Sequence, residues 1–464
     1  MEKEKTTEEL LKEKLFYKKE NAFKCASEDY REKVNAYGEG YKAFLDNAKT
    51  EREAVSEGVK MLKAEGYVEY KLGDKVEKGG KYYLNNRGKS LYAFKIGSED
   101  IENGVRICAA HIDSPRLDLK QHPLYENESF AYFKTHYYGG IRKYQWVTIP
   151  LAIHGVVTLI NGENVEITIG EDENDPVFCI TDLLPHLARE QATKPMSAVF
   201  TGEGMNILIG SEPYGECDEA VKLHMLKILN EKYGICESDF MSAELTALPA
   251  GKAKDLGLDK SMIIGYGHDD KVCAYPCLTS LIESENSPHT VMCILADKEE
   301  IGSEGVSGMK CILLVDLIEE LARSLGANGN IVRANSMCLS ADVNAGYDPL
   351  FPEVYEKRNA AIVNCGVVMS KYTGSGGKSG TSDASAEFVA YLRKIFAEEG
   401  VIWQTAELGK VDVGGGGTVA KYVANQNITT VDVGVAVLSM HAPYEVIAKT
   451  DLYETHKAFC AFCK

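Results

Sequence analysis

One apolar segment and the residues that follow it constrain this chain more than any other stretch. The segment 290–296 reads Thr-Val-Met-Cys-Ile-Leu-Ala, which has the length and composition of a strand buried on both faces. Asp-Lys-Glu-Glu-Ile-Gly follows at 297–302. Ligands of open α/β sheets bind at the carboxyl ends of strands, and adjacent carboxylates there repel each other unless a cation lies beside them. The stretch therefore predicts either a metal site or a solvated acidic turn.

Strand and helix patterns alternate from Met262 to the end of the chain, an order typical of α/β domains. An earlier apolar run, Val105–Ala110, adds a further buried strand. The other predicted strands are Met262–Gly265, Thr290–Ala296, Ser336–Ala341, Ala361–Met369, Ile402–Ala406 and Thr429–Leu438. The predicted helices are Val272–Ile282, Cys311–Leu325, Ser382–Glu398, Thr418–Ala424 and Val446–Phe462.

The middle of the chain has a different character, because residues 119–261 are rich in aromatic and β-branched side chains. We expect a β-rich domain there, inserted into an α/β domain formed by residues 1–118 and 262–464. The 464 residues are too many for one ordinary core, which agrees with two domains. The region before about Glu65 is helical in period, and Gly38 and Gly40 are expected to separate two helices.

Composition excludes several classes of function. The formal net charge of −18 argues against a nucleic-acid partner, whose phosphates would be repelled. No apolar run is long enough to span a membrane, and the first residues do not resemble a signal peptide. Thirteen cysteines are scattered singly, typical of reduced thiols in a cytoplasmic protein. Cys460 and Cys463 form a lone C-x-x-C, which favours reduced cysteines over a zinc ribbon.

Imidazoles and carboxylates follow nearly every predicted strand, and parallel strands would bring them to one edge of a sheet. The five candidate metal ligands are His111, Asp269, Glu300, Asp342 and His441. Zinc takes imidazole nitrogen and carboxylate oxygen, usually with four ligands per ion. With one bridging carboxylate, five side chains supply three protein ligands to each of two ions. The same donors also suit manganese or cobalt.

Neighbouring residues extend this hypothesis. Asp113 could accept the second N–H of the His111 imidazole. Glu299 is a free carboxylate beside the site and a candidate general base for hydrolysis. Asp270 is either a ligand in place of Asp269 or, more in keeping with its position, a residue of a first helical turn or a surface acid. The glycine run 414–417 either presents backbone N–H groups to a ligand, with Gly416 as a candidate substrate contact, or is a flexible loop.

Five short segments, taken together and in order, resemble the motifs of the aspartyl aminopeptidase and vacuolar aminopeptidase I family. They are His-Ile-Asp-Ser-Pro at 111–115, His-Asp-Asp at 268–270, Asp-Lys-Glu-Glu-Ile-Gly-Ser at 297–303, Ser-Ala-Asp at 340–342 and Ser-Met-His at 439–441. The resemblance implies a di-zinc exopeptidase with a phosphorylase/hydrolase-like catalytic domain, whose central mixed sheet carries helices on both faces. It also implies an inserted β-rich dimerisation domain and assembly into a homododecamer.

The same resemblance implies a role for each matched residue. One zinc would be held by His111 and Asp342, the other by Glu300 and His441, with Asp269 bridging the two. Glu299 would be the general base. His186 resembles a family histidine that reaches a neighbouring subunit's active site, and Lys371 resembles a lysine of the substrate pocket. Downstream of Lys371 the segment 372–377 departs from the aspartyl-specific pattern, which leaves the preferred N-terminal residue open.

We therefore expect a metal-dependent aminopeptidase that removes N-terminal residues from peptides with a free N-terminus. Two alternatives stay open: a related metal-dependent deacylase or amidohydrolase with the same ligands, and a catalytically silent oligomeric shell protein. The presence of Glu299 beside a complete ligand set disfavours the silent alternative.

Overall fold

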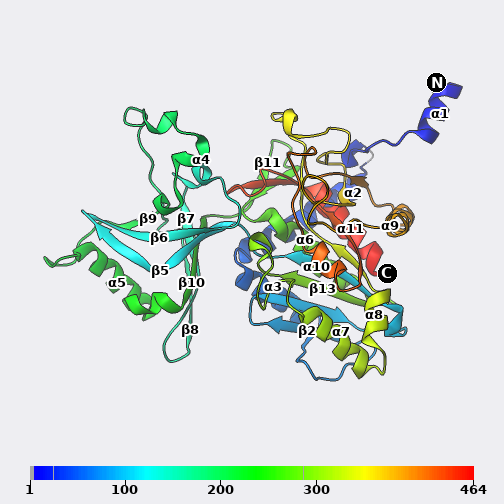
Figure 1. Ribbon diagram of the computed structural model, residues 1–464, viewed down its shortest axis with the longest axis horizontal. Helices are drawn as coiled ribbons and strands as arrows, with labels where there is room; N and C mark the ends of the chain where they lie inside the picture. Colours follow the sequence, from blue (N-terminus) through cyan, green and yellow to red (C-terminus); the bar gives the residue numbers. More distant parts are fainter. Residues whose placement is uncertain (1–4, 25, 286) are drawn as a thin grey trace.

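Three β-sheets organise the chain in the computed structural model, which describes residues 5–24, 26–285 and 287–464. Two of the sheets and most of the helices form a larger lobe (Figure 1, right). The third sheet forms a smaller lobe that extends to one side (Figure 1, left). Its strands are drawn from residues 116–249.

A nine-stranded mixed sheet is the centre of the larger lobe. Its strands, in spatial order, are β1 (Val68–Glu69), β2 (Lys81–Asn86), β3 (Ser90–Lys95), β13 (Thr290–Ala296), β4 (Val105–His111), β14 (Met337–Ser340), β18 (Thr429–Gly434), β16 (Val367–Ser370) and β17 (Trp403–Thr405). The four neighbours β13, β4, β14 and β18 run parallel to one another. Their carboxyl ends therefore open at the same edge of the sheet.

Both faces of this sheet are covered by helices, which explains why the central strands β13 and β4 are buried at every position. Along β13, Val291, Cys293 and Leu295 pack into one core cluster, and Met292 and Ile294 pack into the other. The helices on the first face are α2 (Glu28–Asn47), α3 (Glu51–Ala64), α6 (His268–Glu283), α9 (Ala386–Glu398) and α11 (Lys449–Cys463). Those on the second face are α7 (Leu313–Ser324), α8 (Gly329–Asn335) and α10 (Ala420–Ala424). The prediction of an α/β fold is confirmed.

The expected break at Gly38 and Gly40 is wrong, because α2 continues through both glycines. A Cβ at Gly40 would lie 2.6 Å from the Tyr275 hydroxyl oxygen on α6, and one at Gly38 would lie 3.2 Å from a Lys449 side-chain carbon on α11. These glycines allow α2 to pack closely against two helices, and this close contact offsets their weak helix propensity. A separate helix, α1 (Thr7–Leu15), precedes α2 and has no buried residue.

The smaller lobe is an antiparallel sheet that packs against its own helix and loops. Its strands, in spatial order, are β8 (Asn164–Ile169), β7 (Leu151–Thr158), β10 (Ala243–Pro249), β5 (Arg116–Asn127), β6 (Phe130–Tyr138) and β9 (Ile207–Gly210). Helix α5 (Ala220–Tyr233) contributes Val221 to a separate hydrophobic core. A long connection from β8 to β9 contains the short helix α4 (Met196–Val199).

A five-stranded sheet in the larger lobe was not anticipated. Its strands, in spatial order, are β11 (Lys254–Leu256), β12 (Met262–Gly265), β20 (Glu445–Ala448), β19 (Ala436–Leu438) and β15 (Asn344–Ala345). Met262–Gly265 was expected in the central sheet, and the predicted strand 429–438 proves to be two strands in different sheets. The apolar pattern runs on from β18 into β19, so periodicity alone does not mark the change of sheet. The chain crosses between them at Gly434, where a Cβ would lie 2.0 Å from the Asp342 carbonyl oxygen.

Two other boundaries differ from the sequence prediction. The predicted strand 361–369 is paired in the central sheet only from Val367 on, as strand β16, which ends one residue later at Ser370. The last helix begins at Lys449 and not at Val446, because the preceding residues pair with β12 as strand β20. Apolar residues at a strand end and at a helix start look alike in sequence, so these errors arise from strand pairing that is distant along the chain.

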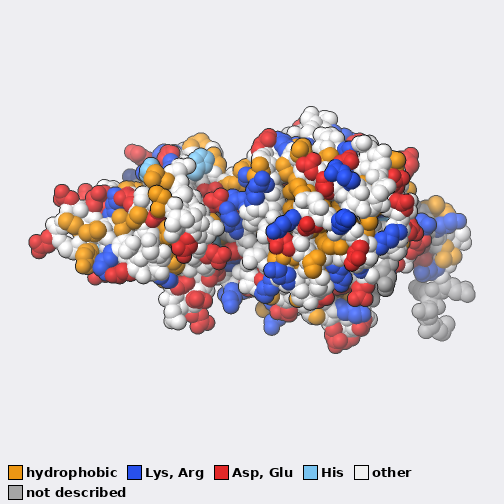
Figure 2. Space-filling model, turned by 90° about the horizontal axis from the view of Figure 1, so that it is seen from below, with side chains coloured by type: hydrophobic (Ala, Val, Ile, Leu, Met, Phe, Trp, Pro, Cys, Tyr) orange, Lys and Arg blue, Asp and Glu red, His pale blue; other side chains and the backbone are white. Residues whose placement is uncertain are grey.

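The surface charges, the helices and the cysteines can each be compared with what the composition indicated. Acidic and basic side chains are intermixed over the face shown in Figure 2. Within the described ranges, every helix is too short or too polar to cross a bilayer. The twelve cysteines in these ranges are all free thiols.

The two lobes are joined by a buried histidine with two carboxylate partners. His154 of β7 places Nδ1 2.7 Å from Glu53 Oε1 on α3 and Nε2 3.0 Å from Glu171 Oε1. Burial opposes protonation, but the two carboxylates outweigh it and raise the pKa of His154. A raised folded-state pKa means that the charged pairing contributes full stability below the unfolded value of about 6.5. This contribution is lost as pH rises through the higher folded-state pKa.

We predict that His154→Gln lowers the free energy of unfolding by about 1–2 kcal/mol below about pH 6, because it removes charge-assisted hydrogen bonds. The deficit relative to the natural sequence should shrink in alkaline buffer. Chemical unfolding across this pH range measures the deficit. The matched control is His122→Gln, which replaces an exposed histidine of β5. A deficit that is the same at acid and alkaline pH would contradict this assignment.

Candidate metal centre

Five side chains from separate strand ends meet in one cluster. His111 ends β4, Glu300 lies in the 3-10 turn after β13, and Asp342 follows β14. Asp269, at the start of α6 after β12, and His441, after β19, come from the five-stranded sheet. Two groups of potential ligands form: His111, Asp269 and Asp342 in one, and Asp269, Glu300 and His441 in the other. Asp269 belongs to both.

The carboxylate of Asp269 faces a different imidazole with each oxygen. Its Oδ1 lies 3.1 Å from His111 Nε2, and its Oδ2 lies 3.1 Å from His441 Nε2. His441 Nε2 is also 3.4 Å from Glu300 Oε1. This is the arrangement of a carboxylate that bridges two ligand groups.

The donor set fits divalent cations. Asp269 Oδ1 and Glu300 Oε1 are buried and have no hydrogen-bond partner among the described residues, although imidazole nitrogens lie close to them. Two N or O ligands of a tetrahedral zinc ion lie about 3.4 Å apart, given metal–ligand bonds of about 2.0–2.2 Å. The observed separations have this size. Buried carboxylates without hydrogen bonds are costly unless a cation compensates them.

Both imidazoles are held in the tautomer that a metal requires. His111 Nδ1 lies 3.0 Å from the Asp113 carbonyl oxygen, and His441 Nδ1 lies 2.8 Å from the Gly140 carbonyl oxygen. A carbonyl only accepts hydrogen bonds, so each Nδ1 carries the proton and each Nε2 offers its lone pair to the cluster. Gly140 follows β6, so the smaller lobe helps to orient one of the histidines.

Asp113 acts on the neighbouring loop more than on the histidine. Its backbone carbonyl, and not the expected carboxylate, takes the His111 N–H; the carboxylate Oδ1 is 3.4 Å from Nδ1. The carboxylate accepts the backbone N–H groups of Glu299 and Glu300, both at 3.1 Å, and the Tyr138 hydroxyl at 2.8 Å. Asp113 therefore positions the turn that carries both glutamates.

Sequence reasoning missed Glu445, which holds two of the candidate ligands. This buried carboxylate on β20 accepts the backbone N–H of Asp269 at 3.0 Å and that of His441 at 2.7 Å. Burial, with the nearby charge of Asp269, raises the pKa of Glu445 to about 8. No motif marked it, because its segment was predicted as the edge of a helix. Asp270 lies in the first turn of α6, one of its expected positions, but it is fully buried and not a surface acid; it accepts the His111 backbone N–H at 3.3 Å.

Glu299 lies beside the cluster without belonging to either ligand group. It lines the same cavity of about 420 Å³ as the five candidate ligands. Burial raises the pKa of the Glu299 carboxyl; His111 opposes this shift, and the charges of Asp113 and Asp269 add to it. A carboxyl of raised pKa is suited to accept a proton.

The other predicted residues have different positions. Gly416 lines the cavity, but its own N–H donates to the Thr373 carbonyl at 3.1 Å. Gly415 and Gly417 of the same run also line the cavity. Lys371 is exposed, lies outside the cavity lining and pairs with Asp383 at 3.5 Å. His186 is exposed on the connection between β8 and α4 and is also outside the lining.

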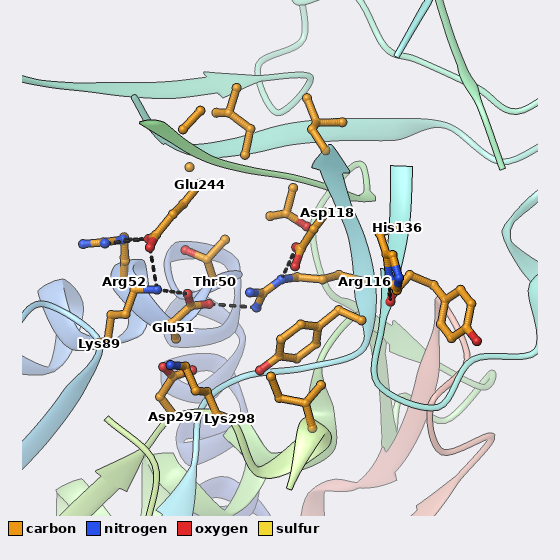
Figure 3. Close-up of a pocket in the computed structure, with 18 of the residues that line it drawn as sticks. Thr50, Glu51, Arg52, Lys89, Arg116, Asp118, His136, Glu244, Asp297 and Lys298 are labelled. Atoms are coloured by element: carbon orange, nitrogen blue, oxygen red, sulfur yellow. Dashed lines mark hydrogen bonds and ion pairs between the residues drawn. The ribbon is translucent and has the colours of Figure 1, made fainter. Parts of the chain in front are cut away.

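A second cavity, of about 720 Å³, lies where the two lobes meet (Figure 3). Two of its cations have carboxylate partners: Arg116 lies 2.8 Å from both Glu51 and Asp118, and Lys89 lies 2.8 Å from Glu244. This paired network links the lobes, and none of the potential metal-ligand groups among the described residues lies in it. Asp297 also lines it and accepts the Ser307 hydroxyl at 2.6 Å, which gives this acid a structural role.

Histidine and carboxylate ligands at the strand ends of a mixed sheet, beside a free glutamate in a cavity, define a metal-dependent hydrolase. The family model described as aminopeptidase I zinc metalloprotease (M18) matches residues 44–463. The chain belongs to this family, and its activity is that of a metal-dependent aminopeptidase.

Known relatives agree over nearly the whole chain. A probable M18 family aminopeptidase 1 of Clostridium acetobutylicum is 50% identical over 464 residues, covering 98% of this chain and 99% of the relative. The crystal structure of an M18 aminopeptidase from Thermotoga maritima is 42% identical with a TM-score of 0.93, covering 97% of this chain and 100% of that one. The S. cerevisiae mApe1 dodecamer, at 24% identity and a TM-score of 0.75, covers 92% of this chain and 96% of that one and shares the fold.

We predict that Glu445→Gln weakens metal binding about 10–100-fold, the usual cost of removing a group that orients metal ligands. The amide cannot accept both backbone N–H groups as strongly as the carboxylate does. Competition with a chelator, using purified protein and zinc, measures the affinity. Glu399→Gln, which removes a carboxylate paired with Lys464, is the control. An unchanged affinity in Glu445→Gln would show that this contact does not support the site.

Proposed function

We propose that this aminopeptidase works with two divalent ions, one held by His111, Asp269 and Asp342 and the other by Asp269, Glu300 and His441. The observation that carries the proposal is the shared Asp269 carboxylate, whose two oxygens face different imidazoles. Zinc agrees with the family description and with the N and O donors, and manganese or cobalt would also fit them.

Bound ions of this kind polarise the carbonyl of the scissile peptide and lower the pKa of a water molecule. Glu299 then takes a proton from the attacking water and delivers it to the leaving amine of the shortened peptide. Two observations support this role. Glu299 shares the cavity of the ligands yet belongs to neither group, and Asp113 holds its backbone in place.

The walls of the cavity suit an uncharged N-terminal residue. Val343, Leu408 and Met440 contribute apolar side chains, and Thr373 a neutral one. Lys421 also lines the cavity, so its charge would be the contact for an acidic residue. Because Lys371 pairs with Asp383 outside the lining, we infer that leucyl-type peptides are better substrates than aspartyl or glutamyl ones.

We further propose that the chain assembles as a homododecamer, as the yeast mApe1 does, with residues 119–261 forming the dimerisation domain. The loop around His186 supports this, because Leu183, Leu184 and Leu187 beside it are more than half exposed. Exposed apolar side chains of this kind mark interaction surfaces. A neighbouring subunit that covered these leucines would place His186 at the interface, where it could reach that subunit's active site.

We predict that Glu299→Gln keeps the metal content of the natural sequence but lowers kcat/KM on leucyl anilide by at least about 10²–10⁴-fold. Elemental analysis and initial rates measure the two quantities. Glu304→Gln, an exposed acid of the same loop, is the control and should keep full activity.

Undiminished turnover in Glu299→Gln would refute its role as base. The same assay includes glutamyl anilide and N-acetyl-leucyl anilide as comparison substrates. Faster cleavage of the glutamyl substrate would contradict the apolar pocket. Release of acetate from the acetylated substrate, with the anilide bond left intact, would favour a deacylase.

A further inference from the structure

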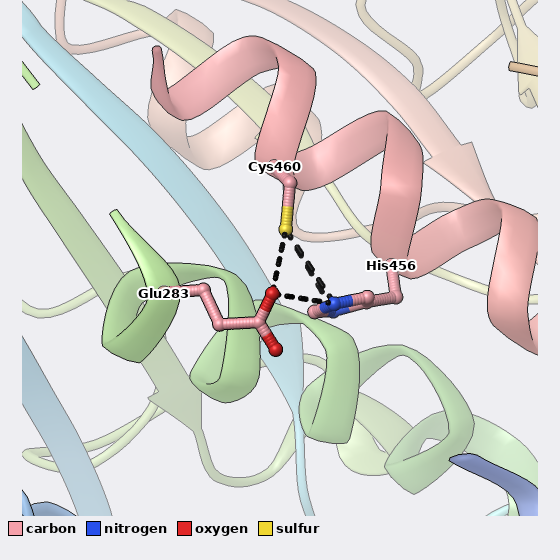
Figure 4. Close-up of side chains that lie close together, drawn as sticks. All are labelled: Glu283, His456 and Cys460. Carbon is pink, nitrogen blue, oxygen red and sulfur yellow. Dashed lines mark hydrogen bonds and ion pairs between the residues drawn. The ribbon is translucent and has the colours of Figure 1, made fainter. Parts of the chain in front are cut away.

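A second cluster of metal-ligating side chains lies away from the active site. It joins the last residue of α6, Glu283, to His456 and Cys460, which are four residues apart on α11. Figure 4 shows the three side chains pointing toward one another from the two helices. Four-residue spacing places His456 and Cys460 on the same helix face, so the helix alone brings two donors together.

The distances among the three donor atoms match those around a tetrahedral ion. His456 Nε2 lies 3.1 Å from Glu283 Oε2 and 3.6 Å from Cys460 Sγ, and the sulfur lies 3.9 Å from the same carboxylate oxygen. With zinc bonds of about 2.1 Å to N or O and about 2.3 Å to S, ligand atoms of a tetrahedral site lie about 3.4–3.6 Å apart. A shift of a few tenths of an ångström would place all three on one ion.

The neighbours of His456 occupy its Nδ1 and leave its Nε2 free to bind a metal. Its Nδ1 lies 2.9 Å from the Thr279 hydroxyl oxygen. The Thr279 hydroxyl has the Tyr275 carbonyl at 3.1 Å as an acceptor for its own proton, which leaves its oxygen to accept an N–H from Nδ1; the Tyr37 hydroxyl lies 2.8 Å from the same oxygen. Nε2 then directs its lone pair toward Glu283 and Cys460. This partner on the far nitrogen is typical of histidines that bind metals.

The cluster is reachable from solvent on its Glu283 side and buried on its His456 side. His456 is 6% exposed, whereas the Glu283 side chain is 60% exposed. Glu283 and Cys460 line an open cavity of about 770 Å³, from which a water molecule can supply a fourth ligand. Burial raises the pKa of the Cys460 thiol, so an ion has to displace its proton to solvent when it binds.

We propose that Glu283, His456 and Cys460 form a separate, structural metal site that binds zinc or a divalent ion of similar softness. Thiolate and imidazole donors select such ions over magnesium or calcium. The ion would tie the C-terminal end of α6 to α11. Because Asp269 stands at the other end of α6, this clamp holds the helix that carries the bridging ligand. The site does not depend on the proposed catalytic mechanism.

Cobalt distinguishes this site from the active site, whose candidate ligands are nitrogen and oxygen only. The full chain is stripped with a chelator, reloaded with Co²⁺ and examined for thiolate-to-cobalt charge-transfer absorption. The natural sequence should show this absorption, and Cys460→Ser and His456→Gln should each lose it. The double variant Cys217→Ser/Cys236→Ser, which removes the two exposed thiols, should keep it.

Metal stoichiometry provides a second measurement. After zinc loading and gel filtration, Cys460→Ser and Glu283→Gln should each contain one ion per chain fewer than the natural sequence. Glu283→Gln leaves every buried side chain intact, so it keeps the test valid if Cys460→Ser fails to fold. Absence of the cobalt absorption in the natural sequence, its persistence in Cys460→Ser, or an unchanged zinc content in Glu283→Gln would each overturn the proposal. In the last case, a simple His456–Glu283 ion pair accounts for the contact.

Discussion

The carboxylate of Asp269 is the point on which the architecture of the metal centre depends. Each of its oxygens approaches a different imidazole at 3.1 Å, one from the nine-stranded sheet and one from the loop after the five-stranded sheet. Its backbone is fixed on both sides: Glu445 accepts the N–H, and the Ser114 hydroxyl donates to the carbonyl at 2.7 Å. Contacts of this one residue therefore fix the position of the five-stranded sheet relative to the nine-stranded sheet, although the two share no strand.

Charge balance explains why these residues require a cation. Burial raises the pKa values of Glu300 and Asp342, and neighbouring carboxylates add to the shift. A folded chain without cations would have to hold several largely buried acids close together, which is costly. Divalent ions remove that cost, so metal binding and the stability of this edge of the sheet are coupled. The smaller lobe takes part through the Gly140 carbonyl and the Tyr138 hydroxyl.

The sequence predicted those parts of the structure that local pattern determines. The doubly buried strand 290–296 and the acids after it were found because both faces of that strand pack against helices. The candidate ligands followed from strand ends and from family motifs, and the structure brings all five together. Local pattern could not assign β12 and β19 to a separate sheet, since pairing partners lie far apart along the chain. It also could not reveal Glu445, whose role depends on two backbone N–H groups brought to it by the fold.

Anomalous X-ray diffraction from zinc-loaded crystals tests the central claim most directly, because it locates each ion without reference to activity. The account predicts two peaks on opposite sides of the Asp269 carboxylate, about 3.5–4 Å apart as in two-metal hydrolases. His111 and Asp342 should contact one peak, and Glu300 and His441 the other. A single peak, or two peaks of which one is not ligated by Asp269, would contradict the account.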